Sequence, residues 1–227
     1  MSKQKKPKKA TTKSTSKKEP ATISEQAFGL DILKAAHPEI KKLKRHHPTS
    51  IHGNKFWGSS YLLMDYFRKN PLAPSVRVLE LGCGWSLASI YLNKNFGVKA
   101  TCLDADDDVF AYAQLHADIN QATIHTEKQR FEKITKADLA EFDLIIAADV
   151  CFWDELTQIH VNLIRRALNA GVSKIIYADP VRSPFTELVE ICDSKLQKSD
   201  IHCALIDARV KSLKASGQLL IIEQVAE

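Results

Sequence analysis

The sequence predicts an α/β protein with a Rossmann-like, doubly wound sheet, mostly parallel, between two layers of helices. Apolar segments of strand length alternate with longer segments that have helical spacing, which is typical of a parallel sheet with helices on both faces. One segment, Val76 to Leu81, runs into a glycine turn and then a helical pattern. The last two strand-like segments have no room for a crossover helix between them, so they predict a C-terminal antiparallel hairpin.

Three helices are predicted ahead of the sheet, and together they make residues 23–70 an N-terminal helical segment. Ser24 to Ala36 has a capping serine and an apolar stripe. Pro38 opens a basic helical stretch. Gly58 to Lys69 places its large apolar residues on one face, and Pro71 follows it.

Residues 71–227 are predicted to form the sheet domain. Short apolar runs predict strands at Val76 to Leu81, Ala100 to Leu103, Thr123 to His125, Phe142 to Ala148 and Val172 to Ala178. Helical spacing predicts helices at Leu87 to Phe96, Asp107 to Ile119, Asp154 to Leu168 and Phe185 to Lys195. The hairpin is predicted from Ile201 to Ile206 and Leu219 to Gln224, joined by a basic loop with Gly217.

The formal charge of +5 comes from the first residues of the chain. Residues 1–20 contain eight lysines and one glutamate, a net +7, and the remaining residues carry −2. Almost nothing in residues 1–22 is apolar, so a disordered basic tail is expected there. The tail is either an arm for nucleic acid, a ribosome or an import receptor, or a solubilising tail without a specific partner.

The amino-acid composition restricts the cellular compartment in which the protein is expected and the kinds of site that it can contain. No apolar run reaches the 18 residues of a membrane span, and the N-terminus has no signal-peptide core. The five cysteines are scattered without a C-x-x-C spacing, and no histidine pair has a convincing metal spacing, so buried thiols and no metal site are expected. These features predict a cytoplasmic protein, or a nuclear one in a eukaryote because of the lysine-rich tail.

The glycine turn predicts a nucleotide-like cofactor at the carboxyl ends of the strands. Glycines at positions 82 and 84 let the backbone approach a ligand, and the next helix presents unpaired amides there. Asp104 ends the next strand about twenty residues on, where an acid accepts hydrogen bonds from a ribose. The third glycine of the dinucleotide fingerprint is missing, because Leu87 takes its position.

This set of residues resembles motif I and the following acid of the class I methyltransferases that depend on S-adenosylmethionine (SAM). The resemblance implies that SAM is the cofactor, that the glycine turn faces its methionine part and that Asp104 holds its ribose. Serine stands at position 86, where the family often has a third glycine. The cofactor-binding residues implied in this way are Trp57, Glu80, Gly82, Cys83, Gly84, Asp104, Ala105 and Ala148. The adenine contact has no sharp motif, and Arg130 and Phe131 are the candidates.

The segment after the fourth predicted strand is the candidate for methyl-acceptor chemistry. Asp149 follows the strand directly, and Phe152 and Trp153 follow it in turn. The segment is similar to the Asp-x-x-aromatic motif of the family-16, nicotinamide N-methyltransferase-like protein lysine methyltransferases. There the acid orients the acceptor amine and the aromatic residue lines its channel, although many members have Tyr at the position of Phe152. The structural alternative is that Asp149 fills a turn and Asp154 caps a helix.

Two further segments resemble the same group. Trp57, in a stretch of small residues before a helix, either packs over the sulfonium of the cofactor or anchors the core. Asp179-Pro180-x-Arg182 is similar to a motif after the fifth strand, and its alternative is a proline turn with a surface arginine. Asn-Pro-Pro-Tyr, typical of enzymes that methylate adenine amines, is absent.

Three functions therefore remain in competition. The first is a SAM-dependent methyltransferase acting on a protein side chain, lysine above all, with Asp149, Phe152 and Trp153 at the acceptor. The second is a small-molecule N- or O-methyltransferase on the same fold, because fold does not fix the substrate. The third is a non-catalytic SAM-fold module that binds RNA or a protein.

Overall fold

The computed structural model describes residues 23–50, 52–196 and 200–225, so the predicted basic tail lies outside the described residues. Within this range a seven-stranded sheet has the order β5-β4-β3-β6-β7-β9-β8. The strands are β3 (Arg77–Leu81), β4 (Lys99–Asp104), β5 (His125–Lys128), β6 (Leu144–Ala148), β7 (Lys174–Asp179), β8 (Ile201–Val210) and β9 (Ala215–Gln224). Only β9 runs against its neighbours, so the predicted mostly parallel sheet with an antiparallel C-terminal hairpin is confirmed.

The hairpin places the reversed strand inside the sheet and not at its edge. β9 is inserted between β7 and β8, and β8 forms the edge of the sheet. Both strands are longer than predicted, so Gly217 lies inside β9 and not in the connecting loop, which is a short 3-10 turn at Lys211–Leu213. The third predicted strand was placed too early, because β5 begins only at His125.

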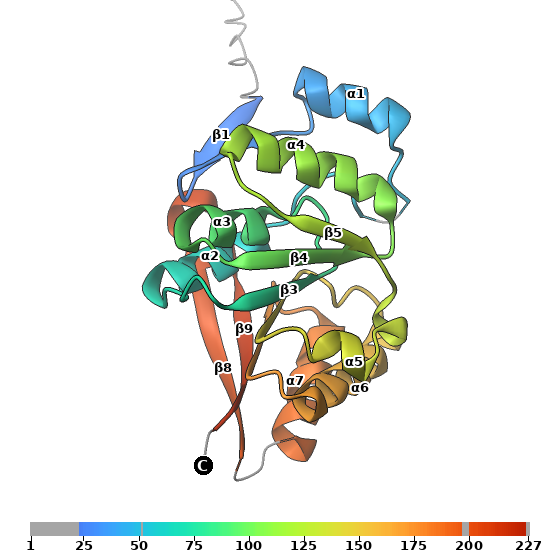
Figure 1. Cartoon of the computed structure of the whole chain (residues 1–227), viewed down its shortest axis with the longest axis vertical. Helices are drawn as coiled ribbons and strands as arrows, with labels where there is room; N and C mark the ends of the chain where they lie inside the picture. Colours follow the sequence, from blue (N-terminus) through green and yellow to red (C-terminus); the bar gives the residue numbers. More distant parts are fainter. Residues whose placement is uncertain (1–22, 51, 197–199, 226–227) are drawn as a thin grey trace, which may run out of the picture.

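Helices cover both faces of the sheet (Figure 1). One face carries α2 (Ser59–Lys69), α3 (Leu87–Phe96) and α4 (Phe110–Asn120), and the other carries α5 (Lys136–Leu139), α6 (Asp154–Ala170) and α7 (Ser183–Lys195). Buried apolar side chains form two clusters, one under each layer. Most of the predicted helices are found close to their predicted bounds.

The predicted helix over Ser24 to Ala36 is wrong. This segment is a hairpin of β1 (Ser24–Ala27) and β2 (Leu30–Leu33), joined by Phe28 and Gly29, which both have positive φ (52° and 76°). Two central residues with φ > 0 are the requirement of a type I′ hairpin turn. The N-terminal segment is therefore not wholly helical, although α1 (Pro38–His46) and α2 do form.

The strand order reverses between β3 and β6. From β3 the chain moves outward to β4 and β5, and it then returns to the other side of β3 with β6 and β7. In open parallel sheets such a switch point leaves a crevice at the carboxyl ends of the two central strands. The functional site is expected there. None of the helices in the described residues is long and apolar enough to cross a membrane.

Candidate active site at the carboxyl ends of β3, β4 and β6

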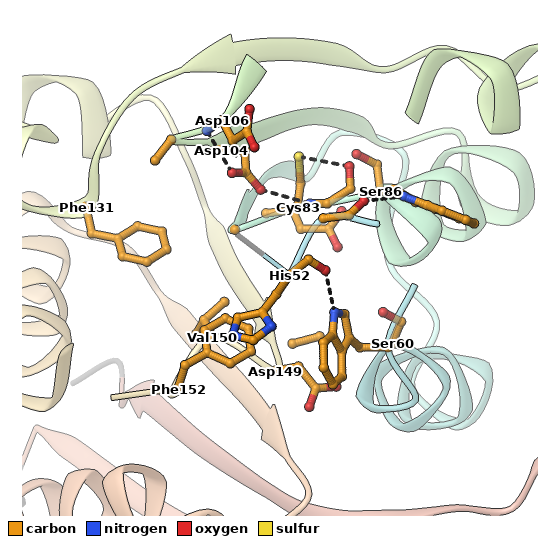
Figure 2. A pocket seen from close by; sticks show the side chains of 18 of the residues that line it. His52, Ser60, Cys83, Ser86, Asp104, Asp106, Phe131, Asp149, Val150 and Phe152 are labelled. Carbon is orange, nitrogen blue, oxygen red and sulfur yellow. Dashed lines mark hydrogen bonds between the residues drawn. The ribbon is translucent and has the colours of Figure 1, made fainter. Parts of the chain in front are cut away.

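A cavity of about 420 Å³ lies at this switch point, in the size range of small-molecule sites. Its walls come from the loops after β3, β4 and β6, and from Ser50 and residues 52–60 ahead of and at the start of α2 (Figure 2). Every residue predicted to bind the cofactor or the acceptor lines it: Trp57, Glu80, Gly82, Cys83, Gly84, Asp104, Ala105, Ala148, Asp149, Phe152 and Trp153. The candidates for adenine, Arg130 and Phe131, line it as well.

The glycine turn after β3 forms a bare backbone wall. Gly82 and Gly84 have φ of 58° and 50°, a conformation that favours glycine. A Cβ added to Gly82 would lie 2.7 Å from Cγ1 of Val150 and 3.3 Å from Cζ of Phe131. A side chain there would press on both walls of the cavity. The hydroxyl of the buried Ser86, in the same turn, has no hydrogen-bond partner within the described residues.

Asp104 is fixed to the same turn. The amide of Gly84 donates to its Oδ2 and the amide of Asp106 donates to its Oδ1, each at 3.0 Å. Burial raises the pKa of Asp104, and these two amide hydrogen bonds oppose that shift. Each carboxylate oxygen keeps a second acceptor site, which suits the pair of hydroxyls of a ribose.

Glu80 lies deeper in the cavity, at the end of β3, and is only 2% exposed. It accepts a hydrogen bond from the amide of Ser89 at 3.2 Å. Burial raises the pKa of Glu80 from 4.5 to about 7. A buried carboxyl of this kind lacks a cationic partner, and the ammonium of an amino-acid moiety would supply one.

Asp149 joins three elements at the opposite end of the cavity. It is 2% exposed, and its left-handed backbone (φ 59°) directs its side chain back toward α2. Oδ2 accepts from the amide of Ser59, the first residue of α2, at 3.0 Å, which satisfies one of the unpaired amides of that helix. Oδ1 pairs with the guanidinium of Arg182 at 2.8 Å. The structural alternative assigned the helix cap to Asp154, whereas here the carboxylate of Asp149 caps α2.

Arg182 connects the ends of β6 and β7. Besides Asp149 it binds the buried Asp179, through Nη1 to Oδ2 and through its amide to Oδ1, each at 2.8 Å. Burial raises the pKa of Asp179, and the contacts with Arg182 oppose this. Arg182 is therefore a partly buried clamp and not a free surface residue. Val181, just before it, has φ 74°, which is a genuine outlier for a β-branched residue.

Aromatic side chains gather at the mouth of the cavity beside Asp149. The ring of His52 stacks on Phe152, with centroids 4.7 Å apart, and lies 5.7 Å from Trp57 and 6.0 Å from Trp153. These four residues are called the aromatic cluster below. The guanidinium of Arg182 lies 5.3 Å from the Phe152 ring and 5.7 Å from Trp57. Trp153 is 46% exposed, so this end of the cavity meets solvent.

The place of His52 in the cluster was not predicted. Its partners Phe152 and Trp153 lie about a hundred residues away in the chain, so no local sequence pattern predicts the contact. Ser50, which binds the carboxylate of Asp106 through its amide and hydroxyl, was missed for the same reason. Asp154, predicted as a possible cap, is instead the first residue of α6, and Trp153 stands at the cap position without a side-chain hydrogen bond.

Comparison with known proteins agrees with this geometry. Residues 78–171 match a family model described as a methyltransferase domain. The chain has a class I, SAM-dependent methyltransferase fold. No protein of curated function matches the sequence.

Solved structures share the fold at low sequence identity. TrmN from Thermus thermophilus is 14% identical with a TM-score of 0.58, covering 74% of this chain and 50% of its own. The Pyrococcus abyssi tRNA (uracil-54, C5)-methyltransferase, in complex with S-adenosyl-L-homocysteine, is 17% identical with a TM-score of 0.59, covering 88% and 44%. The ribosomal protein L11 methylase of Lactobacillus delbrueckii subsp. bulgaricus is 18% identical with a TM-score of 0.54, covering 74% and 79%. This chain thus spans about half the length of the first two.

The cavity suits SAM along its whole length. The wall without side chains at Gly82, the unpartnered Ser86 hydroxyl and the buried Glu80 lie on one side, and Asp104 lies beside them. Bound SAM supplies a methyl group on a positively charged sulfur. The aromatic cluster and Asp149 form the other end, where an acceptor has to arrive.

Proposed function

We propose that this domain transfers a methyl group from SAM to the side-chain nitrogen of a lysine in a protein. The observation that carries the proposal is the sharing of one cavity by two sets of residues, the cofactor set around Gly82 and Asp104 and the acceptor set around Asp149. The acceptor end combines a buried carboxylate with aromatic rings, which is the chemistry that attracts and orients an ammonium group.

Charge at the acceptor end favours a cationic substrate. Asp149 and Asp179 share the single guanidinium of Arg182, so the three side chains carry one net negative charge when ionised. Asp149 lines the cavity and Asp179 lies behind it. We propose that Asp149 faces the incoming ammonium, while Phe152 and Trp153 shape the channel through which the side chain enters.

The open mouth favours an acceptor carried on a larger molecule. Trp153 is 46% exposed and His52 is exposed as well, so the methyl acceptor is reached from the surface. Among the solved structures of this fold, the L11 methylase is named for a ribosomal protein and two others for RNA. The four buried cysteines Cys83, Cys102, Cys151 and Cys192 are free thiols, which supports a cytoplasmic location.

A labelling experiment separates the candidate acceptors. Tritiated SAM and the purified protein are added to a lysate of a strain that lacks it, and we expect label in a discrete protein band at lysine. Label only in small molecules would favour the small-molecule enzyme, and label removed by ribonuclease would favour RNA. Absence of SAM binding in calorimetry would leave the non-catalytic module.

Asp149→Asn tests the acceptor role. It keeps the shape of the side chain but removes the charge that faces the acceptor, so we expect labelling to fall by at least about tenfold with SAM affinity retained. Asp154→Asn, at the exposed start of α6, is the matched control and should label normally. Equal labelling by both variants would contradict the acceptor role of Asp149.

A further inference from the structure

We propose that His52 accepts the proton from the methyl acceptor. This inference rests on the proposed function, because a lysine ammonium has no lone pair and must lose a proton before it can be methylated. General bases act from within hydrogen-bond reach of the proton they remove. The question is which side chain at the acceptor end is free to do so.

Asp149 is already engaged. Its Oδ1 pairs with Arg182 and its Oδ2 accepts from the amide of Ser59, so both oxygens serve the structure of the loop and of α2. A carboxylate oxygen that takes a proton gives up its pairing with a guanidinium or an amide. Asp149 therefore orients the ammonium but does not deprotonate it.

The imidazole of His52 lies at the same end of the cavity as Asp149. It lines the cavity and is stacked on Phe152, and within the described residues neither of its ring nitrogens has a hydrogen-bond partner. In Figure 2 its ring lies over Phe152, and Asp149 lies on the same side of the cavity. Histidine is the side chain whose ordinary pKa lies nearest to neutral pH.

The backbone that carries this ring is held from several sides. The indole of Trp57 donates to the carbonyl of His52 at 3.0 Å, and the buried indole of Trp85 donates to the carbonyl of Gly53 at 2.9 Å. A Cβ on Gly53 would lie 2.6 Å from Val109, so the chain is tightly packed there. His52 itself has φ 51°. An exposed side chain on such an over-determined, left-handed backbone is typical of a functional position.

Charged groups of the neighbouring elements lie against the other rings of the aromatic cluster. From the same segment as His52, Lys55 lies over Trp57 at 4.1 Å, and from the loop after β7 Arg182 lies 5.3 Å from the Phe152 ring. Asp149 and Asp106 line the same cavity from the loops after β6 and β4.

The proposed step balances as follows. An N–H bond of the lysine ammonium breaks, its electron pair stays on the amine nitrogen and the proton goes to the ring nitrogen of His52. The amine nitrogen then bonds to the methyl carbon, and the pair of the broken carbon–sulfur bond remains on sulfur. The imidazolium returns its proton to solvent at the open mouth of the cavity.

The test compares His52→Asn with the wild type in the labelling assay, across pH 6 to 10. Asparagine tolerates the left-handed backbone but cannot take up the proton. We expect its rate at pH 7 to fall by about a hundredfold, with the acid limb of the rate profile moved toward the ordinary pKa of the lysine amine. The difference in rate between His52→Asn and the wild type should decrease toward pH of about 10.4, where the lysine amine loses its proton unaided. His202→Asn, on the exposed edge strand β8, is the matched control.

Two further measurements separate base chemistry from shape. His52→Gly leaves room for added imidazole, which should restore labelling, and calorimetry should show unchanged SAM affinity in both variants. The midpoint of the acid limb should also coincide with the titration of the His52 ring followed by NMR in the wild type. Wild-type rates and pH profile in His52→Asn, or SAM affinity that falls by the same factor as the rate, would overturn the proposal. If the wild type labels no protein at any pH, the proposed function itself fails.

Discussion

At the scale of single residues, the site depends on backbone conformations that most side chains avoid. His52, Ser86, Asp149 and Val181 all have positive φ, and they lie in the segments around the cavity or, for Val181, directly before the clamp formed by Arg182. Each such conformation costs of the order of 1–3 kcal/mol. The surrounding packing and hydrogen bonds must outweigh that cost, which makes the loops stiff where they meet ligand.

Replacing Asp104 by alanine should weaken SAM binding. The sequence resemblance implies that this carboxylate holds the ribose, and a hydrogen bond to a charged group contributes about 1.5–3 kcal/mol, so the dissociation constant should rise about 10- to 100-fold. Calorimetry measures it directly. Asp107→Ala is the control, since that acid pairs with Lys128 outside the cavity. Unchanged affinity in Asp104→Ala would refute the ribose contact.

Glu80 should make the stability of the unliganded protein depend on pH. Its pKa in the fold is about 7, raised from 4.5 by burial. The folded state therefore holds a proton that the unfolded state has lost between these values, and the free energy of unfolding should fall as pH rises from about 4.5 to about 7. The total effect is up to about 3 kcal/mol.

Urea unfolding at pH 5 and pH 8 measures this effect. Glu80→Gln stays neutral throughout, so its stability should fall less than that of the wild type between the two pH values. The same slope in both proteins would mean that Glu80 titrates normally. Saturating SAM should also reduce the slope, because a bound ammonium compensates the buried carboxylate.

At the scale of elements, the loop after β7 is held in place by β9. A Cβ on Gly217 would lie 2.1 Å from the carbonyl oxygen of Asp179, so there is no room for a side chain where β9 passes the end of β7. Gly217→Ala must move β9 or the loop that carries Arg182. We expect a marked loss of stability, of the order of several kcal/mol.

Gly58→Ala is the matched control for that substitution. A Cβ at position 58 would lie 3.9 Å from the Cβ of Ala215, an ordinary contact, and φ there is −67°. Thermal unfolding of the two variants should therefore show a drop for Gly217→Ala alone. Equal melting temperatures would show that the approach of β9 to Asp179 does not restrict the fold.

Local patterns predicted the sheet because its central strands are continuous apolar runs that end in turn residues. They failed at Ser24 to Ala36, where the serine and the apolar stripe favoured a helix but the Phe28-Gly29 turn and burial against α4 decide for a hairpin. They found the residues that lie in motifs along the chain. They missed the clamp geometry of Arg182 and the stacking of His52, because those contacts depend on how distant loops meet.

At the scale of the whole molecule, charge is divided between the first twenty residues and the remainder. Deleting residues 1–20 removes a net +7 and leaves −2. Since the cavity lining found within the described residues runs from Ser50 to Ile159, we expect unchanged SAM affinity and melting temperature. Labelling of the acceptor by the truncated and the full-length protein, measured across salt concentrations, then tests whether the tail contacts a partner. A loss of labelling with a weaker salt dependence would show that the tail contacts an anionic partner.

The position of β9 has a consequence for how the molecule is made. β8 leaves the ribosome before β9, yet it joins the sheet only through β9. During translation, one edge of β7, with Ile175, Ile176 and Tyr177, therefore stays unpaired until β9 has been made. By then β3 is already paired with both of its neighbouring strands. The part of the sheet that holds SAM can therefore fold early. The loop that carries Arg182 reaches its final position only after β9, which contains Gly217, has been synthesised.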